Sequence, residues 1–172
     1  MEREALAQRV DQTIRCIADF PKPGILFRDI TPVLQTGELF GAVCAHFAGL
    51  ATAAHCTAVA GIESRGFVFA APVAAMLGLP LVLIRKPGKL PFRTRKASYA
   101  LEYGTDQIEM HEDALRKGDR VAIIDDLLAT GGTMEAAVRL ARDSGADIGL
   151  VACLIELQGL QGRAKLSGLP VD

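Results

Sequence analysis

Two adjacent carboxylates, Asp125 and Asp126, precede a small, glycine-rich turn in the stretch IIDDLLATGGT, residues 123–133. Two glycines, two hydroxyl side chains and the free amides at the start of a following helix would together make a cradle for an anion. Two ionised carboxylates accept hydrogen bonds from vicinal hydroxyls such as those of a ribose. The stretch therefore predicts a site for a ribose phosphate, whose anion would meet Thr130, Gly131, Gly132 and Thr133.

A purely structural role is the simpler alternative, in which the acids cap the turn and the glycines only permit it. Two other phosphate motifs fit less well. GIESRGF, residues 61–67, has the glycine spacing of a P-loop but Phe67 where the lysine belongs, and the chain contains no G-x-G-x-x-G. Binding of ATP or a dinucleotide is therefore less favoured than binding of a ribose phosphate.

Short apolar runs rich in β-branched residues alternate with helical patterns from residue 58 onward. Such runs are typical of strands covered on both faces, and the alternation predicts an α/β fold with a mostly parallel central sheet flanked by helices. The turn, at residues 127–133, follows one strand at the end where open parallel sheets bind ligands. The expected strands are residues 58–62, 81–85, 120–125 and 148–156, and the expected helices are residues 66–77 and 133–144.

Two further helices are expected in the first third of the chain, over residues 2–18 and 37–53. The first rests on apolar residues at helical spacing and is expected to end at a cluster of proline and glycine. The apolar residues are Leu6, Val10, Ile14 and Ile17, and the cluster is Pro21, Pro23 and Gly24.

The segment 86–106 breaks the alternation of strands and helices, and only its residues 97–103 look like a strand. Long insertions in compact domains often act as lids over a site. Six basic residues and no acid lie between Arg85 and Leu101, which fits either a solvated face or a surface that steers a polyanion. The six are Arg85, Lys86, Lys89, Arg93, Arg95 and Lys96.

The overall composition fits one folded domain, because 50% of the 172 residues are hydrophobic and 23% are charged. The formal net charge of −1 gives no general reason to expect nucleic acid. No apolar run reaches the roughly 20 residues of a membrane-spanning helix, so no membrane partner is expected. Without a signal peptide or C-x-x-C spacing, a cytoplasmic location is expected. Cys44, His46, His55 and Cys56 lack the spacing of a zinc site.

The stretch VAIIDDLLATGGT, residues 121–133, resembles the signature with which type I phosphoribosyltransferases bind phosphoribosyl pyrophosphate (PRPP). Four other segments resemble the adenine-specific members of that family, and they span most of the chain in the expected order. They are DFPKPGILFRDITPVL (19–34), GIESRGFVF (61–69), LIRKPGKLP (83–91) and YALEYGTDQIEMH (99–111).

The resemblance implies an enzyme of purine salvage that transfers the phosphoribosyl group of PRPP to adenine and releases AMP and pyrophosphate. It implies the type I phosphoribosyltransferase fold as a single domain over residues 1–172, with a hood mainly over 1–35 and a flexible catalytic loop at about 86–106. The family also implies a homodimer, and Mg²⁺ held mainly by PRPP instead of by direct protein ligands.

The same resemblance assigns roles position by position. Asp125 and Asp126 would meet the ribose hydroxyls, and Ala129, Thr130, Gly131, Gly132 and Thr133 the 5′-phosphate. Pyrophosphate would bind Glu63, Ser64, Arg65, Arg85, Lys86 and Lys89. Adenine would lie against Leu26, Phe27 and Arg28 in the hood. Glu102 would handle the proton that adenine loses as its ring nitrogen attacks the ribose.

Two other functions stay open. A transferase for an oxopurine such as hypoxanthine or xanthine would share the PRPP site, although LEYGTD and FPKPGILFRDI favour adenine. A PRPP-sensing regulator that binds nucleic acid would need a helix-turn-helix with a basic face, for which the sequence offers no candidate. Family members usually continue beyond LSGLPVD into a final short strand, so we expect an edge strand to be missing or supplied otherwise.

Overall fold

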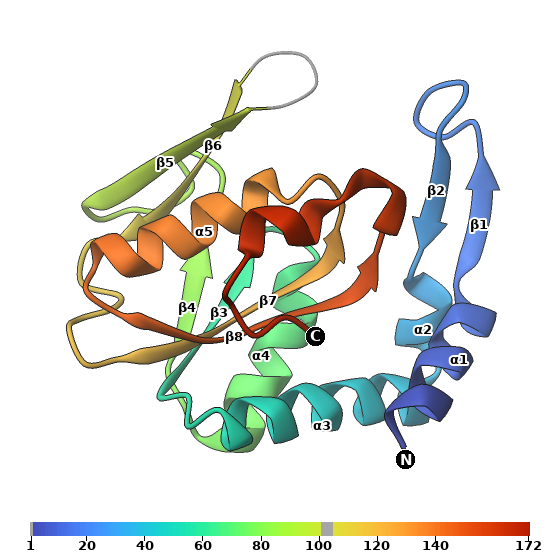
Figure 1. Ribbon diagram of the computed structural model, residues 1–172, viewed down its shortest axis with the longest axis horizontal. Helices are drawn as coiled ribbons and strands as arrows, with labels where there is room; N and C mark the ends of the chain where they lie inside the picture. The colour runs from blue at the N-terminus through green and yellow to red at the C-terminus, as the bar shows by residue number, and fades with distance from the viewer. Residues whose placement is uncertain (1, 101–104) are drawn as a thin grey trace. The chain divides into compact units, whose positions relative to one another are not determined.

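The computed structural model describes residues 2–100 and 105–172 (Figure 1). The chain divides into two compact units, Met1–His46 and Phe47–Asp172. Helix α3 (Gly37–Ala53), which the sequence predicts at the same residues, begins in the first unit and ends in the second. The limits of the single domain and of its hood stay predictions.

The N-terminal unit contains a hairpin where the sequence predicts one long helix. Helix α1 (Arg3–Thr13) ends before β1 (Arg15–Ala18), which pairs antiparallel with β2 (Leu26–Asp29), and the short α2 (Thr31–Gln35) follows. Leu6 and Val10 are buried on α1 as expected, but Ile17 pairs across the hairpin with Phe27. The predicted helix 2–18 is therefore too long, because cross-strand hydrogen bonds take the place of a fourth helical turn.

The proline and glycine cluster that was expected to end this helix lies instead in the hairpin connection. Asp19 adopts a left-handed conformation with φ 57°, and one of its carboxylate oxygens accepts a hydrogen bond from the amide of Gly24. A side chain that closes its own turn in this way is common for aspartate. The peptide bond Phe20–Pro21 is cis.

The second unit is built on a four-stranded parallel sheet in the order β4-β3-β7-β8. Its strands are β3 (Ala58–Ile62), β4 (Leu81–Ile84), β7 (Arg120–Leu128) and β8 (Asp147–Glu156). Helix α5 (Gly132–Asp143) lies in front of the sheet in Figure 1 and α4 (Gly66–Leu77) behind it. The predicted α/β class with a parallel central sheet is confirmed, as are its strands and helices to within a few residues.

Strand β7 is longer than predicted and changes the setting of the two acids. It runs three residues past Asp125, and its last residue, Leu128, pairs with Glu156 of β8. Asp125, expected as the last residue of the strand, and Asp126, expected just after it, therefore both lie inside the strand. Only residues 129–131 connect β7 to α5, fewer than the predicted 127–133; these three residues and the first two of α5, Gly132 and Thr133, are together called the glycine-rich turn below.

The segment expected to form a lid, 86–106, contains one whole strand, which begins three residues before the predicted 97–103. Strand β5 (Thr94–Ala100) pairs antiparallel with β6 (Thr105–His111), which the sequence interpretation missed. The hairpin packs against α5, where the guanidinium of Arg139 donates a hydrogen bond of 2.6 Å to the carbonyl oxygen of Ser98. Its role as a flexible catalytic loop stays a prediction.

The core of the second unit lies between the sheet and its helices. Ile123 and Ile124 of β7 and Leu140 of α5 are fully buried. After β8 come two short 3₁₀ helices, η1 (Gln158–Leu160) and η2 (Gly162–Leu166), and Val171 then forms a parallel bridge with Val151 of β8. Within the described residues, no helix combines the length and the apolar character needed to cross a membrane.

Candidate active site

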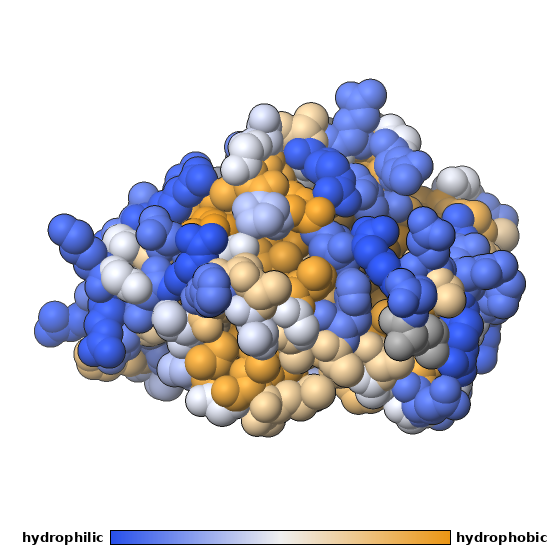
Figure 2. Space-filling view, turned by 60° about the horizontal axis from the view of Figure 1, so that its bottom comes forward, coloured by the Kyte–Doolittle hydropathy of each residue, from blue (hydrophilic) through white to orange (hydrophobic). Residues whose placement is uncertain are grey.

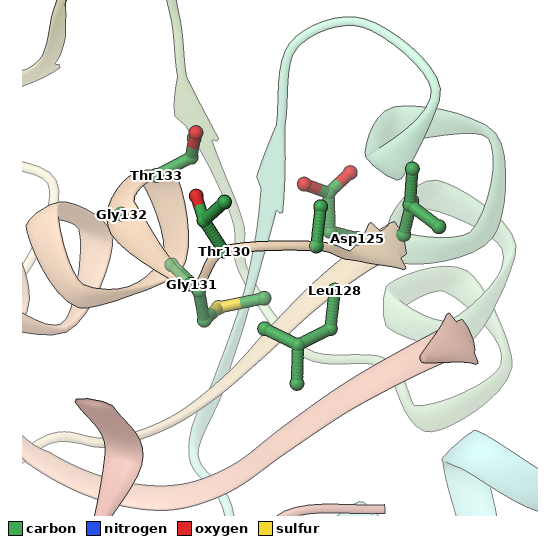
Figure 3. Close-up of a pocket in the computed structure, with 9 residues that line it drawn as sticks. Asp125, Leu128, Thr130, Gly131, Gly132 and Thr133 are labelled. Carbon is green, nitrogen blue, oxygen red and sulfur yellow. The ribbon is translucent and has the colours of Figure 1, made fainter. Parts of the chain in front are cut away.

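The glycine-rich turn connects β7 to α5 and lines a pocket at the carboxyl end of the sheet (Figure 3). Gly131 is the N-cap of α5 and has φ 79°, a conformation that glycine adopts at little cost. Amides in the first turn of a helix have no intrahelical acceptor and favour an anion. The hydroxyls of Thr130 and Thr133 point to the same side as the carboxylate of Asp125. All five residues of the turn line this pocket, so it has the form of an anion cradle.

The two acids of β7 differ in their surroundings. Asp125 lines the pocket and is partly buried, whereas Asp126 is buried and its Oδ2 lies 2.8 Å from Nε of Arg65. Burial raises the pKa of Asp125 well above its usual value, and the charge of Asp126 raises it further. Burial also raises the pKa of Asp126, although the Arg65 guanidinium opposes this. Because burial disfavours the charged form of both carboxyls, hydrogen-bond donors from a ligand would stabilise that form.

The turn that follows β3 packs directly against these acids. Gly66, the first residue of α4, lies so close to β7 that an added Cβ would come within 2.7 Å of the carbonyl oxygen of Ile124 and 2.9 Å of Oδ1 of Asp125. Because β3 and β7 are parallel neighbours, their following turns meet at the same edge of the sheet. The structure thus brings the predicted pyrophosphate turn and the predicted ribose acids together.

Arg85 and Glu63 join two further segments of the predicted pyrophosphate site. The Arg85 guanidinium donates through Nε and Nη2 to the two carboxylate oxygens of Glu63, at 3.1 and 3.0 Å. It also donates to the carbonyl oxygen of Lys89. The amide of Lys86 donates to Glu63, and the arginine's hydrogen bonds lower the pKa of this carboxyl. The peptide bond between Glu63 and Ser64 is cis.

Lys86 reaches the β5–β6 hairpin. Its ammonium donates to the Tyr99 hydroxyl at 2.9 Å and to Oδ2 of Asp106, and the same hydroxyl donates to that carboxylate oxygen at 2.9 Å. Burial lowers the pKa of Lys86, but the hydrogen bonds to Asp106 and Tyr99 outweigh it and the net direction is upward. The hydrogen bond from Lys86 lowers the pKa of Asp106. Both groups are therefore charged at neutral pH.

Glu109 of β6 is a buried acid that the sequence interpretation did not select. Its carboxylate accepts hydrogen bonds from the amide of Gly88 at 2.9 Å and the hydroxyl of Thr94 at 3.1 Å, and lies 3.8 Å from the ammonium of Lys96. Its backbone exchanges both hydrogen bonds with that of Arg85. Glu109 therefore fixes the segment that carries Arg85, Lys86 and Lys89.

A family model of the phosphoribosyl transferase domain matches residues 35–167. The chain belongs to the phosphoribosyltransferase family. Among curated relatives, adenine phosphoribosyltransferase of Butyrivibrio fibrisolvens is 50% identical over 159 residues, which cover 92% of this chain and 88% of the relative. That of Roseiflexus castenholzii is 54% identical over 154 residues, with 90% of each chain covered. This phosphoribosyltransferase thus groups with adenine-specific members.

Solved structures give the same grouping. The crystal structure of adenine phosphoribosyltransferase from Thermoanaerobacter pseudethanolicus has a TM-score of 0.92 and 44% identity, covering 96% of each chain. The Saccharomyces cerevisiae enzyme, complexed with an imino-altritol bisphosphate and adenine, has a TM-score of 0.91 and 36% identity, covering 98% of each chain. The predicted type I phosphoribosyltransferase fold is confirmed for this chain.

The predicted adenine residues of this phosphoribosyltransferase lie on β2 in the N-terminal unit. Leu26 is 52% exposed, and the Phe27 ring packs edge-on against Phe20 with centroids 5.1 Å apart. Arg28 donates a hydrogen bond of 2.8 Å to the sulfur of Cys16, its cross-strand partner. The exposed Leu26 side chain offers apolar surface of the kind that can cover a flat base.

Glu102, the predicted proton acceptor of the phosphoribosyltransferase, lies outside the described residues.

Among the described residues, no group of three or more His, Cys, Asp or Glu side chains could hold a metal ion. Cys44 and Cys56 are buried thiols, and burial raises the pKa of Cys44 to about 11.

Three contributors to the site escaped the sequence interpretation. Gly162 contacts the glycine-rich turn, Glu109 supports the segment after β4, and Asp106 pairs with Lys86. In TDQIEMH, residues 105–111, Asp106 alternates in step with the apolar Ile108 and Met110. This pattern carried a signal for β6 and for an acid on its apolar face, Asp106. Gly162 carried no signal, because a close approach between backbones distant in sequence leaves no local pattern.

Proposed function

We propose that this phosphoribosyltransferase transfers the phosphoribosyl group of PRPP to adenine and forms AMP and pyrophosphate, a reaction of purine salvage. The observation that carries the proposal is the junction of Arg65 with Asp126 beside the glycine-rich turn. It unites an anion cradle, a pair of carboxylates and a cation at the ends of two neighbouring strands. The adenine-specific names of relatives that cover most of the chain support adenine as the acceptor.

The glycine-rich turn would bind the 5′-phosphate of PRPP through amides and the two threonine hydroxyls. The N-terminus of α5 adds a favourable dipole for that anion. Asp125 and Asp126 would accept hydrogen bonds from the two ribose hydroxyls. These contacts fix C1′ of the ribose, the atom at which the reaction takes place.

Pyrophosphate leaves with a large negative charge, so cations and amides must meet it as the bond from C1′ to oxygen breaks. We assign this role to the turn Glu63–Arg65 and to the segment that carries Arg85, Lys86 and Lys89. Contacts of Arg65 with Asp126 and of Arg85 with Glu63 hold these cations at the site. Glu63 acts by orienting Arg85, because a carboxylate would repel pyrophosphate.

Adenine would lie against Leu26, Phe27 and Arg28, and one of its ring nitrogens would form the new bond to C1′. The proton lost from adenine would pass to Glu102, which acts as a general base. Closure of the β5–β6 hairpin over the site would exclude water, which otherwise competes with adenine for the ribosyl group.

Mg²⁺ suits this site, because it binds substrate phosphates and keeps several waters, from which nearby carboxylates can accept hydrogen bonds. Asp125 and Asp126 supply carboxylate oxygens beside the anion cradle. We propose that PRPP itself holds the ion and that no residue is its direct ligand. When bound, Mg²⁺ would neutralise part of the charge that develops on pyrophosphate.

We also propose a homodimer in a reducing cytoplasm, which the four free thiols suit. An apolar surface supports the dimer: Val68 and Met76 of α4 are 38% and 56% exposed, and Leu81 and Leu83 of β4 are each 38% exposed. Figure 2 shows that apolar residues are exposed among polar ones on the face that it draws. Met76→Asp should shift the protein toward monomer in analytical ultracentrifugation, whereas Leu160→Asp, at another exposed site, should not.

The proposal is tested by incubating the protein with PRPP, Mg²⁺ and adenine, with hypoxanthine, guanine and xanthine as parallel acceptors. AMP from adenine alone is the expected product. Product from an oxopurine instead would keep the PRPP site and discard the base assignment. Tight PRPP binding without any product would favour a PRPP sensor.

A further inference from the structure

Three cations of the proposed pyrophosphate site share one property: each is paired with a carboxylate of this chain. The pairs are Arg65 with Asp126, Arg85 with Glu63, and Lys86 with Asp106. Asp126 and Glu63 already belong to the proposed PRPP site. Asp106 has no such role. It belongs to β6, which follows Glu102 in the sequence.

Asp106 is held in place by several donors. Its Oδ2 accepts hydrogen bonds from the Lys86 ammonium and the Tyr99 hydroxyl, and its Oδ1 accepts one from the amide of Gln107. Tyr99 is its direct cross-strand partner and is buried. The Lys86 ammonium also lies 5.5 Å from the centre of the Tyr99 ring. The carboxylate is therefore fixed in one position, and the lysine is drawn to it.

A carboxylate oxygen and a pyrophosphate oxygen are both anionic acceptors for the charged N–H groups of Lys86. Asp106 and Tyr99 take two of the three N–H groups of Lys86, so pyrophosphate can accept more than one of them only if one of these contacts, such as that with Asp106, weakens. The carboxylate also repels any polyanion that comes within a few ångströms of Lys86. Both effects act in one direction and oppose the binding of pyrophosphate.

We propose that Asp106 is an affinity-determining residue that competes with the pyrophosphate group for Lys86 and so weakens the binding of PRPP and of pyrophosphate. The inference rests on the proposed function, because it takes Lys86 as a ligand of pyrophosphate. Such competition speeds the release of product pyrophosphate at the expense of substrate affinity. Asp106 touches no reacting atom, so its effect is confined to ligands that carry the pyrophosphate group.

The size of the effect is modest, because Lys86 and Asp106 are 41% and 33% exposed. Pairs with this exposure contribute up to about 1 kcal/mol, which corresponds to about a fivefold change in affinity. The pair is ionic at neutral pH, in keeping with the lowered pKa of Asp106. A change of this size is well resolved by titration calorimetry.

The experiment measures the binding of Mg²⁺-pyrophosphate and of AMP to wild type and variants by titration calorimetry. Asp106→Asn should bind pyrophosphate about fivefold more tightly and AMP unchanged, because AMP lacks the pyrophosphate group. Asp106→Ser should behave in the same way, whereas Asp106→Glu, which keeps the charge, should stay near wild type. Asp113→Asn is the matched control for the loss of one negative charge, since Asp113 is exposed in the turn after β6.

A double-mutant cycle ties the effect to the lysine. In a Lys86→Met background, Asp106→Asn should no longer change pyrophosphate affinity. Weaker pyrophosphate binding in Asp106→Asn, equal tightening of AMP, the same change in Asp113→Asn, or an effect that survives in Lys86→Met would each overturn the proposal. A wild type that binds pyrophosphate but forms no AMP from adenine would instead count against the proposed function alone.

Discussion

Gly131 of the glycine-rich turn and Gly162 of η2 lie in direct backbone contact. A Cβ added to Gly131 would overlap the carbonyl oxygen of Gly162, and a Cβ added to Gly162 would overlap the carbonyl oxygen of Ala129. The turn is thus held between α5 on one side and the segment after β8 on the other. This contact supports the left-handed conformation of Gly131 from outside the turn.

Gly162→Ala should deform the glycine-rich turn. The added methyl has no room, and overpacking of this kind costs about 1–3 kcal/mol. We expect a lower melting temperature and at least about a tenfold loss of ribose 5-phosphate affinity, since about 1.4 kcal/mol of distortion suffices for tenfold. Gly159→Ala is the control, because a Cβ there meets nothing within 4 Å. Wild-type affinity in Gly162→Ala would show that the contact does not shape the turn.

Asp125→Asn should raise the stability of the protein at neutral pH and lower its affinity for PRPP. The pKa of Asp125 is raised in the folded protein, so its contribution to stability is fully present below the unfolded pKa of about 3.9 and is lost as the pH rises through the folded pKa. The variant lacks this loss and should be more stable than wild type at neutral pH. PRPP affinity should fall about tenfold or more, because hydrogen bonds to charged groups contribute about 1.5–3 kcal/mol.

Urea denaturation at a series of pH values checks the first part of this prediction, and isothermal titration with PRPP checks the second. Asp143→Asn, at an exposed position on α5, removes a charge elsewhere and should show neither effect. A wild type whose stability did not fall with pH relative to Asp125→Asn would contradict the burial argument.

Glu102→Ala should lower kcat more than it weakens PRPP binding. General acid–base catalysis contributes about 10²–10⁴-fold, and the residue is assigned to the proton of adenine and not to PRPP. Steady-state kinetics with both substrates, together with PRPP binding measured without adenine, would separate the two quantities. Unchanged turnover in Glu102→Ala would remove the residue from the mechanism.

Glu109→Ala should loosen the segment that carries Arg85 and Lys89. The change leaves the amide of Gly88 and the hydroxyl of Thr94 without their acceptor, at a cost of about 1–3 kcal/mol. We expect a lower melting temperature and a higher KM for PRPP, with the KM for adenine little changed. Glu112→Ala, at an exposed position nearby, should stay within about 0.5 kcal/mol of wild type.

The central sheet could be predicted because each of its strands is a continuous run of apolar residues. Ile123 and Ile124, both fully buried, are adjacent in sequence, as is typical of a strand covered on both faces. The β1–β2 hairpin could not be predicted in this way. Ile14 and Ile17 happen to continue the helical spacing of Leu6 and Val10, and the choice between helix and hairpin depends on the pairing with β2.

The candidate site likewise contains residues that the local sequence predicts and residues that only tertiary contacts bring to it. The two acids and the glycine-rich turn follow one another along the chain, so their place at the end of one strand of the sheet could be predicted from spacing and residue type. Asp106, Glu109 and Gly162 join the site only through tertiary contacts made by elements far away in sequence. Their chemistry is ordinary for surface acids and loop glycines, and their location alone gives them a role.

The contact between Gly131 and Gly162 can form only after the ribosome has added residue 162 to the growing chain. Residue 162 is added 31 residues after residue 131, which takes roughly 2–6 seconds at about 5–20 residues per second. During this interval the nascent chain carries both acids and the whole glycine-rich turn but not its outer support. If PRPP needs the supported turn, as the proposed function requires, it can therefore stabilise only chains already elongated past residue 162.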